Sequence, residues 1–69
     1  IPLTEKQQAA AEKEIENALY NAGVIYNEKL NDIDNATELF DELVQRFPES
    51  EYLITAYYQL YRLYVKKEV

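Results

Sequence analysis

Two pairs of acidic residues have the spacing that acid–base chemistry would need. Glu12 stands four residues before Glu16, and Glu38 stands four residues before Glu42. On one helix face, one carboxyl could donate a proton while the other accepts it. The 69-residue chain has no His and no Cys, however, so it lacks the commonest proton carriers, nucleophiles and zinc ligands. Carboxylate pairs on polar helix faces are ordinarily solvated. We predict a protein that is not an enzyme, with no catalytic residue, metal or cofactor.

A cluster of Asn and Asp side chains offers the oxygen ligands that calcium prefers. It consists of Asn31, Asp32, Asp34 and Asn35. A calcium loop also needs a Gly at its sharp turn and a Glu at its closing position, and this cluster has neither. Asn and Asp bond to nearby backbone groups and favour turns and helix N-caps. We therefore expect a turn here, with Asp32 as the N-cap of the next helix.

The charge balance restricts the class of partner. The formal net charge is −6 and the pI is near 4.4. Nucleic acids and anionic membrane surfaces need a dense basic patch, whereas the seven Lys and Arg residues are scattered apart from Lys66 and Lys67. No apolar run approaches the ~20 residues of a membrane span. We expect protein partners, no nucleic acid and no membrane insertion by this segment.

The elements that position these residues are expected to be helices. One Gly, two Pro residues and apolar side chains at helical spacing predict an all-α chain that forms a single unit over residues 1–69. We expect helices over 4–29, 33–47 and 51–67. Because the chain begins with Ile1 and not Met, we expect it to be a piece of a longer protein.

Capping residues and apolar stripes define the first two helices. Thr4 and Gln7 have the spacing of a capping box, Pro48 is expected to end the second helix, and Ser50 is expected to cap the third. Each of the first two helices carries one apolar stripe. The stripes consist of Ile15, Leu19, Ala22 and Tyr26 in the first helix and Ile33, Ala36, Phe40, Leu43 and Phe47 in the second.

The third helix is apolar around most of its circumference and therefore expects cover on more than one face. Its apolar residues are Leu53, Ile54, Tyr57, Tyr58, Leu60, Tyr61, Leu63, Tyr64 and Val65. A chain of this length buries only about 60% of its unfolded surface, and it has no disulfide or zinc to reinforce it. We expect a homodimer of the isolated chain, formed through Tyr57, Leu60, Tyr61 and Tyr64.

The sequence also repeats itself. Ala18, Tyr20 and Tyr26 recur 38 residues later as Ala56, Tyr58 and Tyr64. A period of 20–50 residues is typical of stacked helical units, which bury their faces on one another and present a surface. The repetition predicts a protein that binds rather than catalyses.

The pattern resembles the tetratricopeptide repeat, in which pairs of antiparallel helices stack into a superhelix. The matching residues are Leu19, Ala22, Gly23 and Tyr26 in the first helix and Ala36, Phe40 and Pro48 in the second. Leu43 is bulkier than the Ala usual in the family, and Tyr61 replaces the Gly expected in the second copy. The resemblance implies about one and a half repeats that act as a non-enzymatic module for protein–protein interaction or scaffolding. A structural spacer without a ligand of its own is the alternative.

The resemblance also implies roles for individual side chains. It places Tyr20, Val24 and Asn27 of the first copy, with Tyr58 and Arg62 of the second, on the inner face that such repeats use for protein ligands. Tyr26 and Tyr64 stand in the slot that packs one helix on the next.

A second resemblance concerns the segment after the second helix. Arg46, Phe47, Pro48, Ser50 and Tyr52 look like the longer repeats of bacterial envelope proteins, and the ending with Tyr58, Leu60, Tyr61 and Tyr64 is similar to repeat lipoproteins of Bacteroidetes gliding motility and type IX secretion. This resemblance implies an outer-membrane lipoprotein on the periplasmic side of the envelope. A cytoplasmic location is the alternative.

Overall fold

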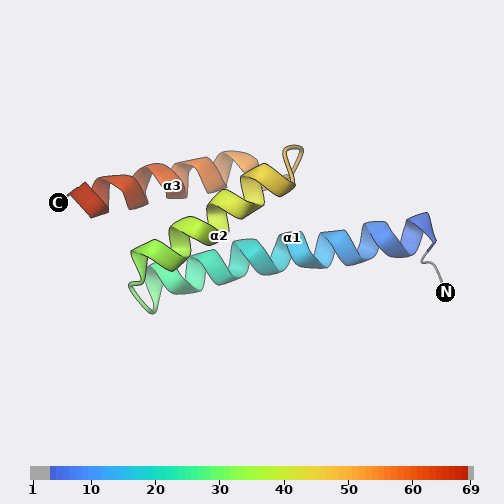
Figure 1. Cartoon of the computed structure of the whole chain (residues 1–69), viewed down its shortest axis with the longest axis horizontal. Coiled ribbons are helices and arrows are strands. Elements are labelled where there is room, and N and C mark those ends of the chain that lie inside the picture. Colours follow the sequence, from blue (N-terminus) through green and yellow to red (C-terminus); the bar gives the residue numbers. More distant parts are fainter. Residues whose placement is uncertain (1–3, 69) are drawn as a thin grey trace.

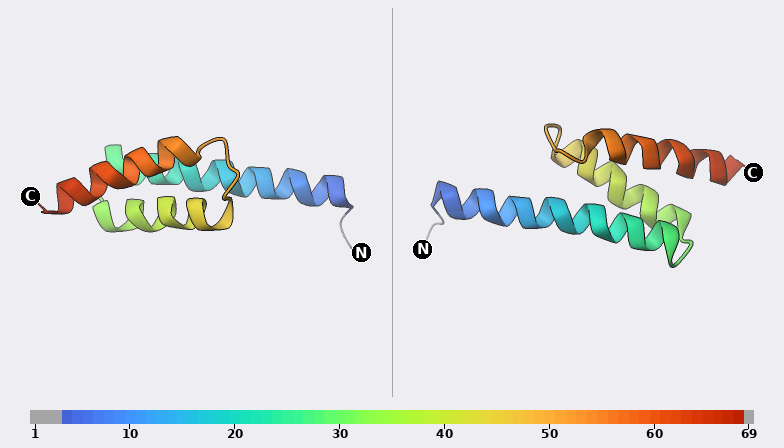
Figure 2. Two further views of the ribbon diagram at one scale, coloured as in Figure 1. Left: turned by 90° about the horizontal axis from the view of Figure 1, so that it is seen from above. Right: turned by 180° about the vertical axis from the view of Figure 1, so that it is seen from behind.

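Three helices make up the protein in a computed structural model that describes residues 4–68. They are α1 (Glu5–Glu28), α2 (Ile33–Arg46) and α3 (Leu53–Glu68), and Figure 1 shows each running antiparallel to the one before it. The helix α2 lies between the other two and packs against both. The N-terminal part of α1 extends beyond the other helices (Figure 2). The expected all-α architecture is confirmed, and no strand occurs within residues 4–68.

The first helix begins at the expected capping box. Thr4 Oγ1 accepts a hydrogen bond of 3.1 Å from the amide of Gln7, and the Gln7 side chain accepts one of 2.9 Å from the amide of Thr4. Two of the unpaired amides at the helix start are thereby satisfied. The first half of α1 is largely exposed, so the capping box and not packing defines where it begins.

The turn between α1 and α2 uses the Asn and Asp cluster as expected. Asp32 Oδ1 accepts a hydrogen bond of 3.2 Å from the amide of Asn35, which makes Asp32 the N-cap of α2. Asn31 has a φ of 51°, a left-handed conformation that Asn tolerates better than most residues. The turn chemistry that the sequence predicts is confirmed.

The start of α3 corrects one expectation. The helix begins at Leu53, two residues after the expected position 51, because residues 51 and 52 form a tight turn. The Ser50 hydroxyl accepts a hydrogen bond of 3.0 Å from the amide of Tyr52, and the amide of Leu53 donates to the Ser50 carbonyl at 3.1 Å. Ser50 therefore caps this turn, and the regular helical bonds start after it.

The core lies on both sides of α2. Its buried apolar residues are Leu19, Ala36, Phe40, Leu43, Ala56, Leu60 and Leu63. Leu60 is only 5% exposed, so the expectation that it belongs to an exposed self-association surface is wrong. The physical reason is its helical phase: Ala56, Leu60 and Leu63 share the face of α3 that packs on α2.

One close approach fixes how α1 meets α2. The ring of Phe40 is fully buried, and it lies so near Gly23 that a Cβ atom built there would be 2.7 Å from Phe40 Cζ. Only a residue without a side chain leaves room for the ring at this distance. The helix pair of the repeat is therefore joined by a glycine on one helix and an aromatic ring on the other.

Candidate functional site

Polar side chains join α1 to α3 along the side of the molecule that these two helices form. We call it the inner side. Asn27 Nδ2 donates a hydrogen bond of 3.0 Å to Gln59 Oε1, and Lys66 Nζ donates one of 3.1 Å to Asn27 Oδ1. Asn27 is 8% exposed. The sequence placed this residue among the ligand contacts. In the structure its side chain is occupied in holding the two helices together.

An aromatic stack makes a second link, between α1 and the turn that precedes α3. The ring of Tyr20 lies parallel to that of Tyr52 with centroids 4.4 Å apart, and it meets Phe40 edge-on at 5.9 Å. The Tyr52 hydroxyl donates a hydrogen bond of 2.7 Å to Asn17 Oδ1. Tyr20 is half-buried in these contacts. The ring therefore fastens α1 to α2 and to the turn before α3.

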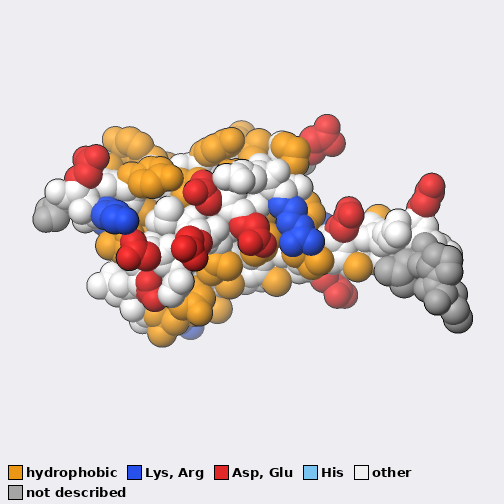
Figure 3. Space-filling view, in the orientation of Figure 1, with side chains coloured by type: hydrophobic (Ala, Val, Ile, Leu, Met, Phe, Trp, Pro, Cys, Tyr) orange, Lys and Arg blue, Asp and Glu red, His pale blue; other side chains and the backbone are white. Residues whose placement is uncertain are grey.

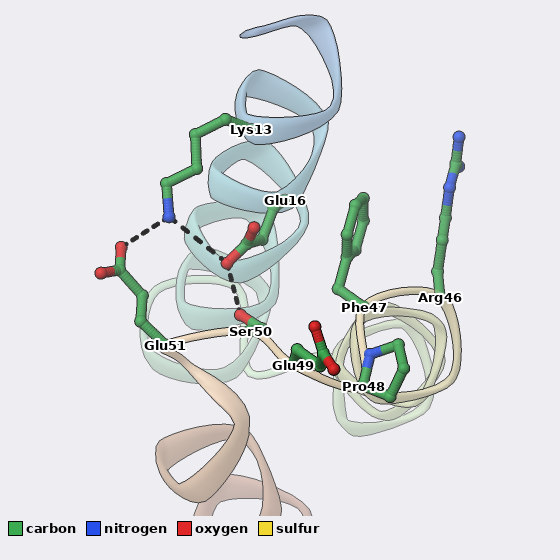
Figure 4. Close-up of a pocket in the computed structure, with 8 residues that line it drawn as sticks. All are labelled: Lys13, Glu16, Arg46, Phe47, Pro48, Glu49, Ser50 and Glu51. Carbon is green, nitrogen blue, oxygen red and sulfur yellow. Dashed lines mark hydrogen bonds and ion pairs between the residues drawn. The ribbon is translucent and has the colours of Figure 1, made fainter. Parts of the chain in front are cut away.

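A charged network makes a third link, between α1 and the loop before α3. It lies next to a surface hollow of about 430 Å³ (Figure 4). The Ser50 hydroxyl donates a hydrogen bond to the Glu16 carboxylate, and Lys13 Nζ lies 3.5 Å from the same carboxylate and 2.8 Å from that of Glu51. The hydrogen bond to Glu51 is the main cause that raises the pKa of Lys13 above its ordinary value.

The network changes the interpretation of Glu16. The sequence predicted a solvated charge, but this carboxylate is buried and hydrogen-bonded. Its lone pairs are shared by a hydroxyl and an ammonium group, so the arrangement fastens α1 to the loop before α3. Glu12, its expected partner, is exposed, as are Glu38 and Glu42. Nothing in the spacing of Glu16 and Ser50 along the sequence announced their contact.

Two of the predicted contact residues remain open to solvent on the inner side of α3. Tyr58 is exposed, and the Arg62 guanidinium lies over its ring, 5.9 Å from the centroid. Val24, on α1, is half-buried and packs against the core. The structure thus divides the five predicted residues: Tyr20 and Asn27 make contacts inside the molecule, Val24 packs on the core, and Tyr58 and Arg62 are exposed to solvent.

The side of α3 next to Tyr58 and Arg62 carries exposed apolar side chains. Figure 3 shows hydrophobic side chains gathered along the outer edge of this helix. The residues concerned are Ile54, Tyr57, Tyr61, Tyr64 and Val65, of which Ile54 is 85% exposed. We call this set the outer strip of α3. Tyr64, expected in a packing slot, is about half exposed because no helix covers it within the described residues.

The helix pair with its glycine and aromatic contact also matches a known family. A family model described as the tetratricopeptide repeat matches residues 17–50, about half of the chain. This part of the chain is similar to the tetratricopeptide repeat. The match covers the second half of α1, all of α2 and the turn to Ser50, and α3 lies beyond it. The family's repeats are non-catalytic modules that generally mediate protein–protein interaction.

The other comparisons add no relative to the repeat. No curated protein and no solved structure matches the chain at a significant level. None of the helices in residues 4–68 has the length and apolar content that crossing a membrane requires.

Proposed function

We propose that the repeat binds a protein segment across the inner side formed by α1 and α3, with Tyr58 and Arg62 as direct contacts and Val24 beside them. Tyr20 and Asn27 act indirectly, because they hold the two helices in place. The observation that carries the proposal is the exposed pair on α3, an aromatic ring with a guanidinium over it. Aromatic and Arg side chains are the types that dominate binding energy at protein interfaces.

Arg62 indicates the chemistry of the partner. Within residues 4–68 it makes no ion pair with a carboxylate, whereas the other exposed arginine, Arg46, lies 3.7 Å from Glu42. A guanidinium presents a planar fork of donors that matches a carboxylate. We therefore propose a partner segment that combines an acidic side chain with an apolar or aromatic one.

Peptide-display selection against the 69-residue chain tests this proposal. We expect enriched sequences to contain Asp or Glu near an apolar residue, and Arg62→Ala to weaken binding of such a peptide at least ~10-fold, as for a truncated interface anchor. Arg46→Ala is the matched control, because this arginine is also exposed and lies 5.7 Å from an aromatic centroid. Circular dichroism checks that helicity is kept. Equal losses in both variants would contradict the proposal.

A structural spacer is the second candidate function. The observation in its favour is that Tyr20 and Asn27 are engaged inside the molecule, as the parts of a rigid connector would be. If Tyr20→Ala and Arg62→Ala leave partner capture unchanged, the spacer is the better description.

We also propose that the isolated chain forms a homodimer through α3. The exposed tyrosines of the outer strip, Tyr57, Tyr61 and Tyr64, support this proposal, whereas the buried Leu60 has no part in it. Sedimentation equilibrium as a function of concentration tests it, and a chain that stays monomeric near ~1 mM would exclude all but the weakest association.

The cellular setting is a separate proposal. We propose that the chain belongs to a bacterial envelope protein of the secretion or gliding type, on the periplasmic side. Its support is the resemblance of the segment from Arg46 to Tyr52 to repeats of such proteins. Mass spectrometry of the native N-terminus tests it: a lipid-modified Cys supports the proposal, and an unmodified cytosolic start contradicts it.

A further inference from the structure

The 38-residue period shows what kind of face the outer strip of α3 is. Tyr57, Tyr61 and Tyr64 correspond to Leu19, Gly23 and Tyr26 of α1. In the first unit these α1 residues face or border α2, and Gly23 touches the Phe40 ring. The outer strip is therefore the side of α3 on which the repeat receives a further helix.

A helix of the α2 type does not fit this side in the same way. At Gly23 even a methyl group would lie 2.7 Å from the Phe40 ring. Tyr61 places a whole phenol at the corresponding position, so an aromatic ring like that of Phe40 finds no room there. A helix that covers the strip must pack at a larger distance, with side chains that interleave rather than one ring against bare backbone.

The spacing along the strip suits such packing. Ile54, Tyr57, Tyr61 and Tyr64 follow one another at intervals of three, four and three residues, which is the a and d pattern of paired helices. A second α3 offers the same pattern, so the strip is complementary to itself, as a two-fold symmetric interface requires. We propose that two copies of the chain pair through α3 in antiparallel orientation. This inference rests on the self-association proposed above and adds its geometry.

The charges at the two ends of α3 favour one relative orientation of the two copies. Glu49 and Glu51 precede α3, and Lys66 and Lys67 lie in its last turn. Glu51 and Lys67 pair with Lys13 and Asp34 at the surface, yet both side chains remain mostly exposed. Antiparallel pairing brings the basic end of one helix beside the acidic start of the other and opposes the two helix dipoles. Parallel pairing would place like charges together.

The area of the outer strip indicates how strongly the two copies should associate. A Tyr side chain can bury up to about 150–250 Å², and the strip residues are roughly half or more exposed, which gives on the order of 500 Å² for each copy. The resulting total of about 1,000 Å² is at the lower limit for a specific interface. We therefore expect a dimer that forms at micromolar or higher concentration.

Disulfide trapping tests the orientation, because the chain contains no Cys of its own. In the antiparallel arrangement, Ile54 of one copy lies level with Tyr64 of the other. We expect an oxidised mixture of I54C and Y64C to give a mixed disulfide at least ~5-fold stronger than either self-linked product, since like positions would be about 15 Å apart. Self-linked products of each variant alone would show parallel pairing and overturn the inference while leaving the homodimer intact.

Sedimentation equilibrium of the Y61E variant is the second test of the dimer interface. We expect the dimer dissociation constant to rise at least ~10-fold, because a charge would be buried at the centre of the strip. The matched control is L30E, a substitution of an exposed apolar residue outside α3. It should leave the dissociation constant unchanged. Wild-type chain that stays monomeric near ~1 mM overturns the inference together with the proposed dimer. Peptide binding through Arg62 is measured separately.

Discussion

The helices α1 and α3 occupy corresponding places in the repeat, but the corresponding face is buried in α1 and exposed in α3. In α1 this face carries Gly23 and closes on the ring of Phe40. In α3 it carries Tyr61, which is 68% exposed. The glycine lets the Phe40 ring approach the backbone of α1, whereas the phenol at the corresponding position of α3 leaves no room for such an approach.

The polar residues differ in the same sense. Glu16 and Asn27 of α1 are buried and bond to the loop before α3 and to α3 itself. Their counterparts 38 residues later are Ile54 and Val65, which are apolar and exposed. Hence α1 is held by specific hydrogen bonds along this side, whereas α3 offers apolar surface whose burial depends on a further helix.

The largest predicted effect removes the ring that α1 encloses. Phe40→Ala should cost about 3–5 kcal/mol, because it deletes a fully buried aromatic side chain and leaves a cavity. A chain of this size has little more stability than that, so we expect loss of the cooperative thermal transition in circular dichroism. Tyr57→Ala, on the exposed side of α3, should keep the transition. Retention of a normal melting curve in Phe40→Ala would show that the ring is not central to the core.

The two faces should differ clearly in their response to substitution at the corresponding positions Gly23 and Tyr61. Gly23→Ala should destabilise by about 1–3 kcal/mol, since the added methyl overlaps the ring of Phe40 and this outweighs the better helix propensity of Ala. Tyr61→Ala should change the free energy of unfolding by less than about 0.5 kcal/mol at concentrations where the chain is monomeric. Urea denaturation of both variants measures the two values. Equal effects would remove the distinction between the faces.

A smaller effect is expected at the polar link. Asn27→Ala breaks the hydrogen bonds to Gln59 and Lys66 and should cost about 0.5–1.5 kcal/mol for each bond that water does not replace. Val65→Ala, at the corresponding position of α3, should cost less because it shortens a partly exposed apolar side chain and breaks no hydrogen bond. Urea denaturation compares the pair. If Val65→Ala proves the more damaging, α3 is covered in solution.

The smallest effect concerns the ion pair at the surface. The raised pKa of Lys13 means that its contribution to stability is complete below the pKa in the unfolded chain, ordinarily 10.5, and is lost as pH rises through the higher value of the folded state. The stability difference between wild type and Lys13→Gln should therefore shrink above that pH. Lys6→Gln, a control on the exposed part of α1, should show no such change. Tyr ionisation is common to all three proteins and cancels in the comparison.

Local features of the sequence predicted much of the fold. The capping box at Thr4, the cap at Asp32 and the buried stripe of Ala36, Phe40 and Leu43 are all confirmed. Each depends on residues within a few positions of one another, so the sequence contains the whole signal. The late start of α3 was missed because the Ser50 hydroxyl can cap either a helix or a tight turn.

The candidate site could be predicted only in part. The resemblance to the tetratricopeptide repeat placed Tyr58 and Arg62 among the ligand contacts, and both are exposed. It also placed Tyr20 and Asn27 among the ligand contacts, although stacking and hydrogen bonds engage both side chains inside the molecule. The link from Glu16 to Ser50 had no signal at all, because contacts between residues 34 positions apart leave no periodic trace.

The sequence by itself determined that the chain forms three helices, where two of them are capped and which face of α2 is buried, because helix caps and helical periodicity are local properties. Only the tertiary structure decided which side of α3 is covered. That helix is apolar nearly all round, so its pattern favours no face, and the position of α2 buries Leu60 and leaves Tyr61 exposed. The same packing turned Glu16, Tyr20 and Asn27 into connections between helices, since their partners come together only when the chain folds.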